Sequence, residues 1–356
     1  MELRRATADD LPDLALLLAQ RDEDGRREAH VSATLCDLDP ERIAVWIASA
    51  HGEPAGMTAL YLRSMRWPGR GEVRVGYWAH LFVVPEHRRL MLYPQLVFAM
   101  RKAMRELGIA AIVTGNRRPS VAEGHLKLGF AVACTWPVRI KPLRPFRLLG
   151  KHKGVAWARA LAPLGDSLWR LRIRRPKPPT GIELEHVQDA AHAGTFVLDA
   201  VADLLAERSG DRISTAWTAD LLRARLAVGI DGEPYRLVLA RRGGAIEGVA
   251  IYRTASRGDG VHTGALLELA ARDDDARTLA ALRGAVEVSL LERDADVALW
   301  LDGAGGAASE ALRGGGYIQA KGEQYQMLVF PADDAERAPA NDPGNWRFTL
   351  LDHDAF

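Results

Sequence analysis

The sequence predicts an α/β fold built from two copies of one unit. Three observations support this prediction. The length of 356 residues exceeds that of one compact mixed domain. Strand-like apolar runs and helical periodicity follow each other several times along the chain. The same order of four elements occurs twice, with an offset of about 180 residues, which indicates an internal repeat.

The first two elements recur in the same form. Residues 2–18 predict a short strand, an Asp-rich helix start and an amphipathic helix, and residues 183–205 predict the same. A predicted hairpin follows each of them. Residues 44–63 are two apolar runs around a short turn, and residues 236–254 have the same pattern around a Gly-Gly pair.

The last two elements recur in register with the first two. A strand that leads into a helix is predicted for residues 78–108 and again for 265–294. A buried strand, a helix and a Gly-aromatic pair are predicted for 110–130 and again for 297–317. Four matches in one order favour two copies of the same α/β unit over chance similarity.

The composition is that of a globular protein, with 48% apolar and 26% charged residues. No uncharged apolar run approaches the ~20 residues that a membrane span needs, and the first residues lack the apolar core of a signal peptide. The two cysteines, Cys36 and Cys134, form no disulfide framework and favour a reducing compartment. We therefore expect a cytoplasmic protein. The histidines show no metal-ligand spacing, so we expect no metal.

The charge is unevenly distributed along the chain. Lys and Arg outnumber Asp and Glu by 12 to 1 in residues 139–177, whereas the acidic residues dominate by 29 to 17 in residues 178–356. The basic segment also carries Trp and Leu residues, which is compatible with a nucleic-acid contact or a membrane-surface helix. We favour a third interpretation, in which the segment docks on the acidic second half of the chain.

We expect the basic segment to end at the stiff Arg-Arg-Pro-Lys-Pro-Pro run. The predicted organisation is a first domain at 1–145, a basic linker at 146–180, a second domain at 181–335 and a C-terminal tail at 336–356.

A strand followed by Val84-Pro85-Glu86-His87-Arg88-Arg89, a helix and then Leu128-Gly129-Phe130 resembles the GNAT acyltransferases. Both repeats are compatible with that fold, so the resemblance covers about 300 residues as a tandem. It implies that each repeat is a mixed, mostly antiparallel sheet flanked by helices. It also implies acetyl-CoA or another acyl-CoA as the co-substrate.

The resemblance places the donor in the first repeat, with the pantetheine arm along the backbone of Phe82, Val83 and Val84. It places the pyrophosphate at the start of the next helix, where backbone N–H groups bind anions. The residues expected around the pyrophosphate are Arg88, Arg89, Leu90, Met91, Leu92 and Tyr93.

The expected pyrophosphate loop departs from the family pattern. Arg88 matches the family arginine, but Arg89, Met91 and Tyr93 stand where the family has small residues, mostly glycine. The guanidinium groups of Arg88 and Arg89 compensate in part by direct charge. In the second repeat the corresponding loop carries the carboxylates of Asp273, Asp274 and Asp275, which repel a pyrophosphate. We therefore interpret that repeat as a degenerate copy that binds no donor.

Four residues are candidate catalytic groups. His125 stands where the family often carries the tyrosine that protonates the leaving thiolate, and the second repeat has Leu312 there. His80 is the candidate base for the acceptor, Glu72 is a more distal base candidate, and Tyr93 has a phenol beside the expected thiol position. A purely structural role remains open for all four residues. For His125 it is an exposed helix position, for His80 a half-buried strand position, and for Tyr93 packing at the helix start.

The predicted function is transfer of an acyl group from acyl-CoA to an amine or hydroxyl of a small molecule or sugar. One alternative is a non-catalytic tandem pseudo-acyltransferase that binds a ligand or partner. Another is a Fem-like transferase that uses aminoacyl-tRNA and would engage the basic segment. We do not expect a nucleic-acid partner, and the sequence leaves the acceptor and the oligomeric state open.

Overall fold

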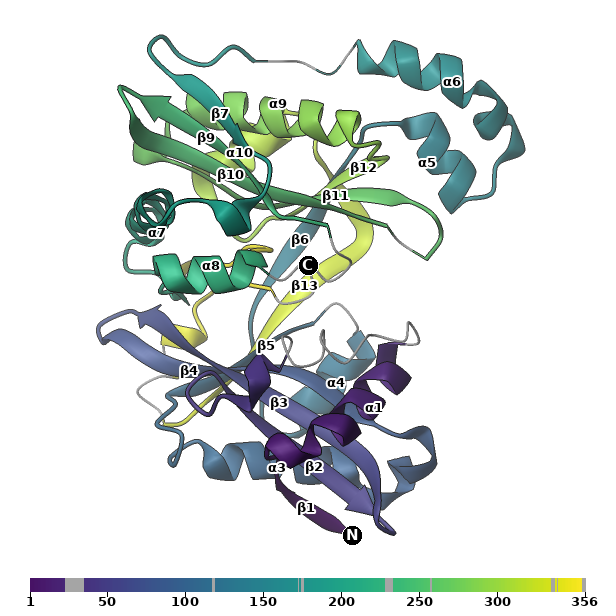
Figure 1. Cartoon of the computed structure of the whole chain (residues 1–356), viewed down its shortest axis with the longest axis vertical. Helices are drawn as coiled ribbons and strands as arrows, with labels where there is room; N and C mark the ends of the chain where they lie inside the picture. Colours follow the sequence, from purple (N-terminus) through teal and green to yellow (C-terminus); the bar gives the residue numbers. More distant parts are fainter. Residues whose placement is uncertain are drawn as a thin grey trace. The chain divides into compact units, whose positions relative to one another are not determined.

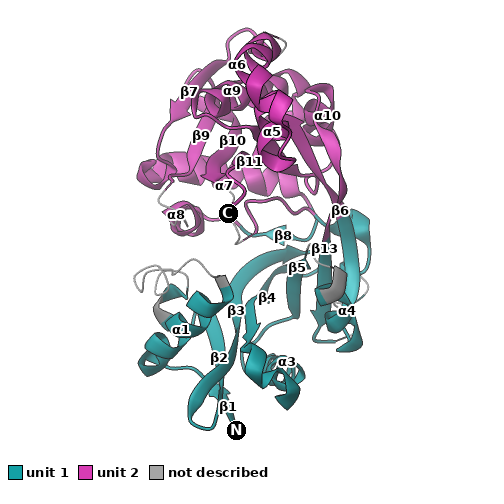
Figure 2. Ribbon diagram, turned by 90° about the vertical axis from the view of Figure 1, so that its right-hand side faces the viewer, with its two compact units in different colours: residues 1–135, 211–216, 326–346 teal, residues 136–210, 217–325, 347–356 magenta. Residues whose placement is uncertain are grey.

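The computed structural model describes residues 1–22, 35–116, 119–171, 173, 176–227, 233–256, 258–333, 337 and 339–353. The chain forms two compact units of mixed α/β structure (Figures 1 and 2). Unit 1 comprises Met1–Thr135, Asp211–Ala216 and Gln326–Trp346, and unit 2 comprises Trp136–Gly210, Trp217–Tyr325 and Arg347–Phe356. Residues 146–180, the expected linker, fall within unit 2.

Unit 1 contains one sheet with the strand order β1-β2-β3-β4-β5-β13. Its neighbouring strands are antiparallel except for the parallel pair β4–β5. The short strand β8 (Ser214–Thr215) pairs with β3. The other elements of the first repeat are β1 (Glu2–Arg5), η1 (Ala8–Asp10), α1 (Leu11–Asp22), η2 (Cys36–Leu38), β2 (Ile43–Ala50), β3 (Glu53–Trp67), β4 (Gly71–Val83), η3 (Pro85–Leu90), α3 (Leu92–Ala103), β5 (Ala111–Asn116), α4 (Pro119–Lys127) and β6 (Ala131–Pro142).

Unit 2 contains the strand order β6-β12-β11-β10-β9-β7, again with one parallel pair, β11–β12. The remaining elements are α5 (Pro145–His152), α6 (Ala156–Arg170), β7 (Glu183–Val187), η4 (Ala190–His192), α7 (Thr195–Ser209), α8 (Ala219–Ala227), β9 (Arg236–Arg242), β10 (Ala245–Ser256), β11 (His262–Ala271), η5 (Arg272–Asp274), α9 (Ala276–Glu292), β12 (Val297–Leu301), α10 (Gly306–Gly314), β13 (Ile318–Pro331) and η6 (Pro343–Asn345).

The predicted fold class and the predicted repeat are confirmed, because the described order β1-α1-β2-β3-β4-α3-β5-α4-β6 recurs as β7-α7-β9-β10-β11-α9-β12-α10-β13, with β8 and α8 added in the second repeat. The two repeats exchange their last strands, which the sequence did not indicate. The β5 strand of unit 1 pairs with β13, the last strand of the second repeat. In unit 2, β12 pairs with β6, the last strand of the first repeat.

Amphipathic helices cover both faces of the unit 1 sheet. On α1, Leu14, Leu17 and Leu18 recur at helical spacing and are fully buried against β2 and β3. On the opposite face, the buried apolar residues of α3 pack against β2, β3 and β5 together with Trp78 and Phe130. The sheet therefore lies between two apolar layers, one beneath α1 and one beneath α3 and α4.

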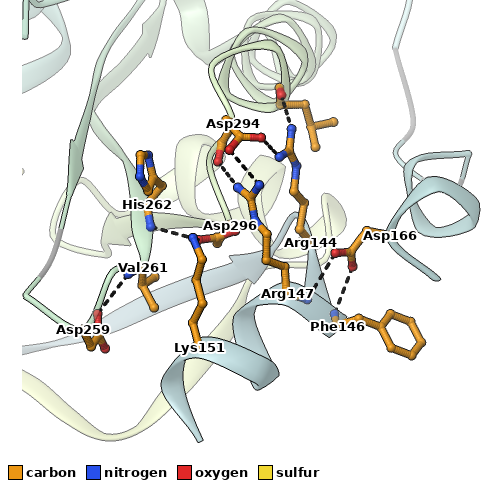
Figure 3. Close-up of polar contacts among 11 residues, drawn as sticks. Arg144, Phe146, Arg147, Lys151, Asp166, Asp259, Val261, His262, Asp294 and Asp296 are labelled. Atoms are coloured by element: carbon orange, nitrogen blue, oxygen red, sulfur yellow. Dashed lines mark hydrogen bonds and ion pairs between the residues drawn. The ribbon is translucent and has the colours of Figure 1, made fainter. Parts of the chain in front are cut away.

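The basic segment docks on acidic residues of unit 2 through ion pairs (Figure 3). Arg144 and Arg147 pair with Asp294, while Arg147 and Lys151 pair with the fully buried Asp296. The predicted docking is confirmed for these three cations. Three further basic residues of the segment, Arg172, Arg174 and Arg175, lie outside the described residues.

None of the helices in the described residues is both long and apolar enough to cross a membrane. Within the same residues, no group of three or more His, Cys, Asp or Glu side chains is arranged to hold a metal ion.

Candidate active site

His125 and Tyr93 come together from two helices of unit 1. His125 lies on α4 and is 3% exposed, and its Nδ1 is 2.8 Å from the Tyr93 hydroxyl at the start of α3. Gly124 allows this approach, because a Cβ there would stand 3.0 Å from the Tyr93 hydroxyl oxygen. The sequence prediction placed both residues at the leaving-group side of the site, and the structure brings them into hydrogen-bond contact.

Trp78 of β4 forms the floor beneath the imidazole. Its ring stacks on that of His125 with centroids 4.2 Å apart. Trp78 is itself held by two hydrogen bonds, since its Nε1 donates to Thr58 Oγ1 at 2.7 Å and its carbonyl accepts from Thr114 Oγ1 at 3.1 Å. These contacts hold the His125 ring in one orientation over the strand.

Burial controls the protonation of this pair. Desolvation lowers the pKa of His125 to about 4 and raises the pKa of Tyr93 to about 12. Both side chains are therefore neutral near pH 7. A neutral imidazole that donates its Nδ1 proton to the phenol oxygen leaves the phenol O–H directed elsewhere, so the pair can present one proton to a third group.

His80 lies on the opposite face of the sheet from His125. The register of β3 and β4 changes between the pairs Met57–Phe82 and Ala59–Ala79, so β4 carries one extra residue there. His80 belongs to this bulge and has a left-handed φ of 53°. As a result its side chain contacts Tyr61, a residue packed against the α1-side apolar layer, rather than following Trp78 toward α3 and α4.

Two partners determine the tautomer of His80. Its Nδ1 lies 2.7 Å from Arg21 Nη1, and its Nε2 lies 2.6 Å from the Tyr61 hydroxyl. A guanidinium only donates hydrogen bonds, so Nδ1 accepts from Arg21 and Nε2 carries the proton that it donates to Tyr61. The basic nitrogen of His80 is thus Nδ1, and a cationic N–H donor already contacts it.

Glu72 does not join these residues. It is exposed at the start of β4, where it pairs in register with Arg66. Eight residues of extended strand separate it from His80, a distance of roughly 25 Å.

Strand β4, which carries His80, stops pairing with β5 just before this residue. The parallel ladder of β4 and β5 covers three pairs and ends at Tyr77–Val113. Strand β4 continues to Val83 along β3, where Gly56 lies so close that a Cβ would meet the Phe82 carbonyl at 2.9 Å. The segment Phe82–Val84, which the sequence analysis predicts to contact the pantetheine arm, therefore lies beyond the last β4–β5 pair.

The expected pyrophosphate loop is the 3-10 helix η3 followed by Met91. Met91 has a left-handed φ of 55° and a largely exposed side chain, so the backbone takes the glycine-like conformation without a glycine. Within the described residues no side chain caps the start of α3. Arg88, Arg89 and Leu90 are exposed beside it, whereas the Leu92 side chain is buried in the core and can offer only its backbone.

In the second repeat the corresponding helix start is occupied by its own carboxylates. The Asp275 side chain accepts from the backbone N–H of Arg277 and caps α9. Asp274 pairs with Arg208, and Arg272 pairs with Glu207 at 2.5 Å. The residue that corresponds to His125 is Leu312, which is fully buried.

The C-terminal tail fills the gap in the ladder of unit 2. The parallel pairs of β11 and β12 end at Leu266–Trp300, and β11 has a bulge at that level. Beyond it, Leu351 N–H donates to the Leu267 carbonyl and Phe348 N–H donates to the Gly303 carbonyl, both at 3.1 Å. The tail thus donates hydrogen bonds to the strand edge that corresponds, in unit 1, to the edge of β4 beyond Tyr77.

Tyr61 and Arg21 are site residues that the sequence did not indicate. Both come to His80 because of the bulge, and a one-residue bulge leaves no pattern in the residue types of a strand. The apolar strand around His80 predicted that this residue is half-buried. The face of the sheet on which its side chain lies depends on the register between β3 and β4, which the residue types do not reveal.

The comparisons with known proteins support the predicted family. Residues 11–130 match the sequence model of the acetyltransferase (GNAT) family, and this range includes the η3 loop, Tyr93 and His125. No curated protein sequence matches the chain. For residues 11–130, the predicted family and enzyme class, a GNAT-type acyltransferase, are confirmed by the family match.

Several solved structures share the fold over nearly the whole chain. A GCN5-related N-acetyltransferase from Anabaena variabilis is 13% identical with a TM-score of 0.62, covering 93% of this chain and 73% of that one. N-myristoyltransferase from Saccharomyces cerevisiae with bound myristoyl-CoA is 11% identical with a TM-score of 0.64, covering 97% and 88%. A tandem GNAT protein from the clavulanic acid biosynthesis pathway is 13% identical with a TM-score of 0.59, covering 93% and 99%. The predicted tandem GNAT fold is thereby confirmed.

Proposed function

Residues 11–130 belong to the acetyltransferase (GNAT) family, and on this premise we propose that the first repeat transfers an acyl group from acyl-CoA to an acceptor. The acceptor is an amine or hydroxyl of a small molecule or sugar, and acetyl-CoA is the first donor to test. The reaction belongs to the cytoplasm, which agrees with the absence of Cys36 and Cys134 from any disulfide.

The donor lies in the gap of the unit 1 ladder. Its pantetheine arm follows Phe82, Val83 and Val84 beyond the last β4–β5 pair. Its pyrophosphate lies at the uncapped start of α3, where the helix dipole and the backbone N–H groups favour an anion. Arg88 and Arg89 add direct positive charge, while Leu90, Met91, Leu92 and Tyr93 line the approach through their backbone.

The leaving-group proton comes from the Tyr93–His125 pair. As the acceptor attacks the thioester carbonyl, the carbon–sulfur bond breaks and the thiolate takes the phenol proton of Tyr93. His125 donates its Nδ1 proton in a hydrogen bond to the phenolate and stabilises it. This hydrogen bond is the single observation that carries the proposal, because it joins the two residues named for this step at 2.8 Å in a buried setting.

The acceptor approaches His80 from the other face of the sheet. Arg21 shows that a cationic N–H donor fits against Nδ1 of His80. An acceptor amine displaces Arg21 from this position, and Nδ1 then receives the proton that the nitrogen loses on forming the new amide bond. Proton donor and proton acceptor then lie on opposite faces of the gap that holds the thioester. Glu72 lies too far along β4 to share this step directly.

The test is acyl transfer by the full chain with acetyl-CoA and a panel of small amines and amino sugars. Product and free CoA are quantified by chromatography and mass spectrometry, because the protein's own cysteine thiols would interfere with thiol reagents. We expect equimolar product and CoA with at least one acceptor, and loss of both in Tyr93→Phe. Binding of acetyl-CoA without turnover across the panel would instead support a pseudo-acyltransferase, which the glycine-free η3 loop favours.

A further inference from the structure

Helix α6 has an unburied apolar stripe along one face. The stripe consists of five residues that are 50% to 82% exposed: Trp157, Leu161, Leu164, Leu168 and Leu171. Their spacing alternates between four and three positions, so they lie in one row about 21 Å long. Isolated exposed leucines are common, but a continuous row of this kind marks an interaction surface.

The opposite face of α6 is already engaged within unit 2. Asp166 accepts hydrogen bonds from the backbone N–H groups of Phe146 and Arg147, at 3.0 and 3.1 Å. Trp169 Nε1 donates to the Pro142 carbonyl, and Ala158 is fully buried. Helices α5 and α6 lie beside each other at the edge of unit 2 (Figure 1). These contacts hold the helix in an orientation that leaves the stripe outward.

The surroundings of the stripe are positively charged. Residues 139–177 contain 12 Lys and Arg against one carboxylate, Asp166, which is buried and bonded to backbone N–H groups. Three of these cations, Arg144, Arg147 and Lys151, are paired with Asp294 and Asp296, so the charge near the stripe comes from the others. Lys153 precedes α6, Arg170 ends it and Lys177 follows, and all three are exposed. A Leu- and Trp-rich face with the exposed cations Lys153, Arg170 and Lys177 at its two ends matches the interfacial helices that lie on anionic lipid.

We propose that α6 docks on an anionic membrane surface, with the apolar stripe at the acyl boundary and Lys153, Arg170 and Lys177 against lipid phosphates. The helix lies on the bilayer and does not span it. The acyltransferase of the first repeat then works beside a membrane. The proposal rests on α6 alone and does not depend on the function proposed for the first repeat.

A second copy of the chain is a poorer occupant of the stripe. Two such segments would bring like charges together, and this repulsion opposes association. One 15-residue helix also provides less than the ~1,200 Å² of buried surface that a stable protein interface needs. An anionic lipid surface does not repel the basic segment, and binding to it does not need a protein-sized interface. Its phosphate groups complement the cations.

The test is co-sedimentation of the full chain with vesicles of phosphatidylcholine, with or without about one third phosphatidylglycerol. We expect binding to the anionic vesicles, weakened by salt, and little binding to phosphatidylcholine alone. Leu164→Ser with Leu168→Ser should lower the partition coefficient by about tenfold or more. Phe196→Ser, at another exposed apolar position of unit 2, is the matched control and should bind like the unchanged protein.

Four outcomes would overturn the proposal. One is failure to sediment with anionic vesicles. Another is equal binding by the double variant, with the thermal unfolding of all proteins unchanged. The third is a dimer in solution that the double substitution dissociates, which would assign the stripe to a second copy. Salt-sensitive tRNA binding without vesicle binding would likewise contradict the lipid assignment.

Discussion

The Tyr93 hydroxyl and Nδ1 of His125 lie 2.8 Å apart although the residues are 32 positions apart in the chain. Tyr93 lies in the first turn of α3 and His125 lies near the end of α4. The ring of Trp78 stacks on the imidazole of His125. The hydrogen bond links the expected thiol position with the position of the family's usual proton donor. It makes the two residues one functional unit in the proposed reaction.

Removing either member of this pair should slow the chemical step without affecting donor binding. Tyr93→Phe and His125→Phe should each lower kcat by ~10²-fold, which is the usual contribution of a general acid. The double variant should lose little more, because the residues act together. Steady-state kinetics with acetyl-CoA check this, and near-normal turnover in Tyr93→Phe would exclude the pair as the proton source.

His125 should make the stability of the protein depend on pH. Its pKa is about 4 in the folded chain against an ordinary value of 6.5, because burial disfavours the imidazolium. Below pH 6.5 the unfolded chain therefore binds more protons, and the free energy of unfolding falls as the pH drops from 6.5 to 4, by up to about 3 kcal/mol. Denaturant titrations should show this loss, and His125→Phe should lack it. His192→Phe, at an exposed position, should retain it.

Gly124 should control activity through the position of Tyr93. A methyl group at Gly124 would meet the Tyr93 hydroxyl at 3.0 Å, so Gly124→Ala must displace the phenol. We expect kcat to fall by about tenfold, since small misplacements of a catalytic group are costly. In Gly314→Ala, on the corresponding helix of the second repeat, the new methyl group has open space. That variant should keep its activity, and equal activity in both would contradict the predicted role of the close approach.

The C-terminal tail should stabilise unit 2 through a buried ion pair. Arg347 Nη2 lies 2.8 Å from Glu268 Oε1, and both side chains are almost fully buried. Arg347→Met leaves Glu268 as an unpaired buried charge, which should cost about 3–5 kcal/mol in denaturant unfolding. Adding Glu268→Leu to that variant removes the charge and should recover much of the loss. If the double variant were no more stable than Arg347→Met, packing rather than charge would explain the effect.

The repeat and its elements could be predicted because apolar periodicity reports local structure. The predicted hairpin at 44–63 corresponds to β2 and β3, and the predicted strand and helix at 78–108 correspond to β4 and α3. The docking of Arg144, Arg147 and Lys151 also follows from a property of the sequence, since charges of opposite sign were concentrated in adjacent segments.

Long-range register could not be predicted in the same way. The exchange of β6 and β13 depends on which strand edge each one meets, and the residue types of a strand do not specify that edge. The bulge that moves His80 to the α1 face is likewise a property of pairing. The tail that lies along Leu267 and Gly303 makes backbone hydrogen bonds, which are available to any residue type.

The most direct test of the account is calorimetric titration of the full chain with acetyl-CoA, because the central claim is a donor site in the first repeat alone. Arg88→Glu places a negative charge beside the pyrophosphate position and should raise Kd by about tenfold or more. Arg272→Glu, the matched change in the second repeat, should leave Kd unchanged. A stoichiometry of one with this pattern would support the account. Equal losses in both variants, or a loss only in Arg272→Glu, would contradict it.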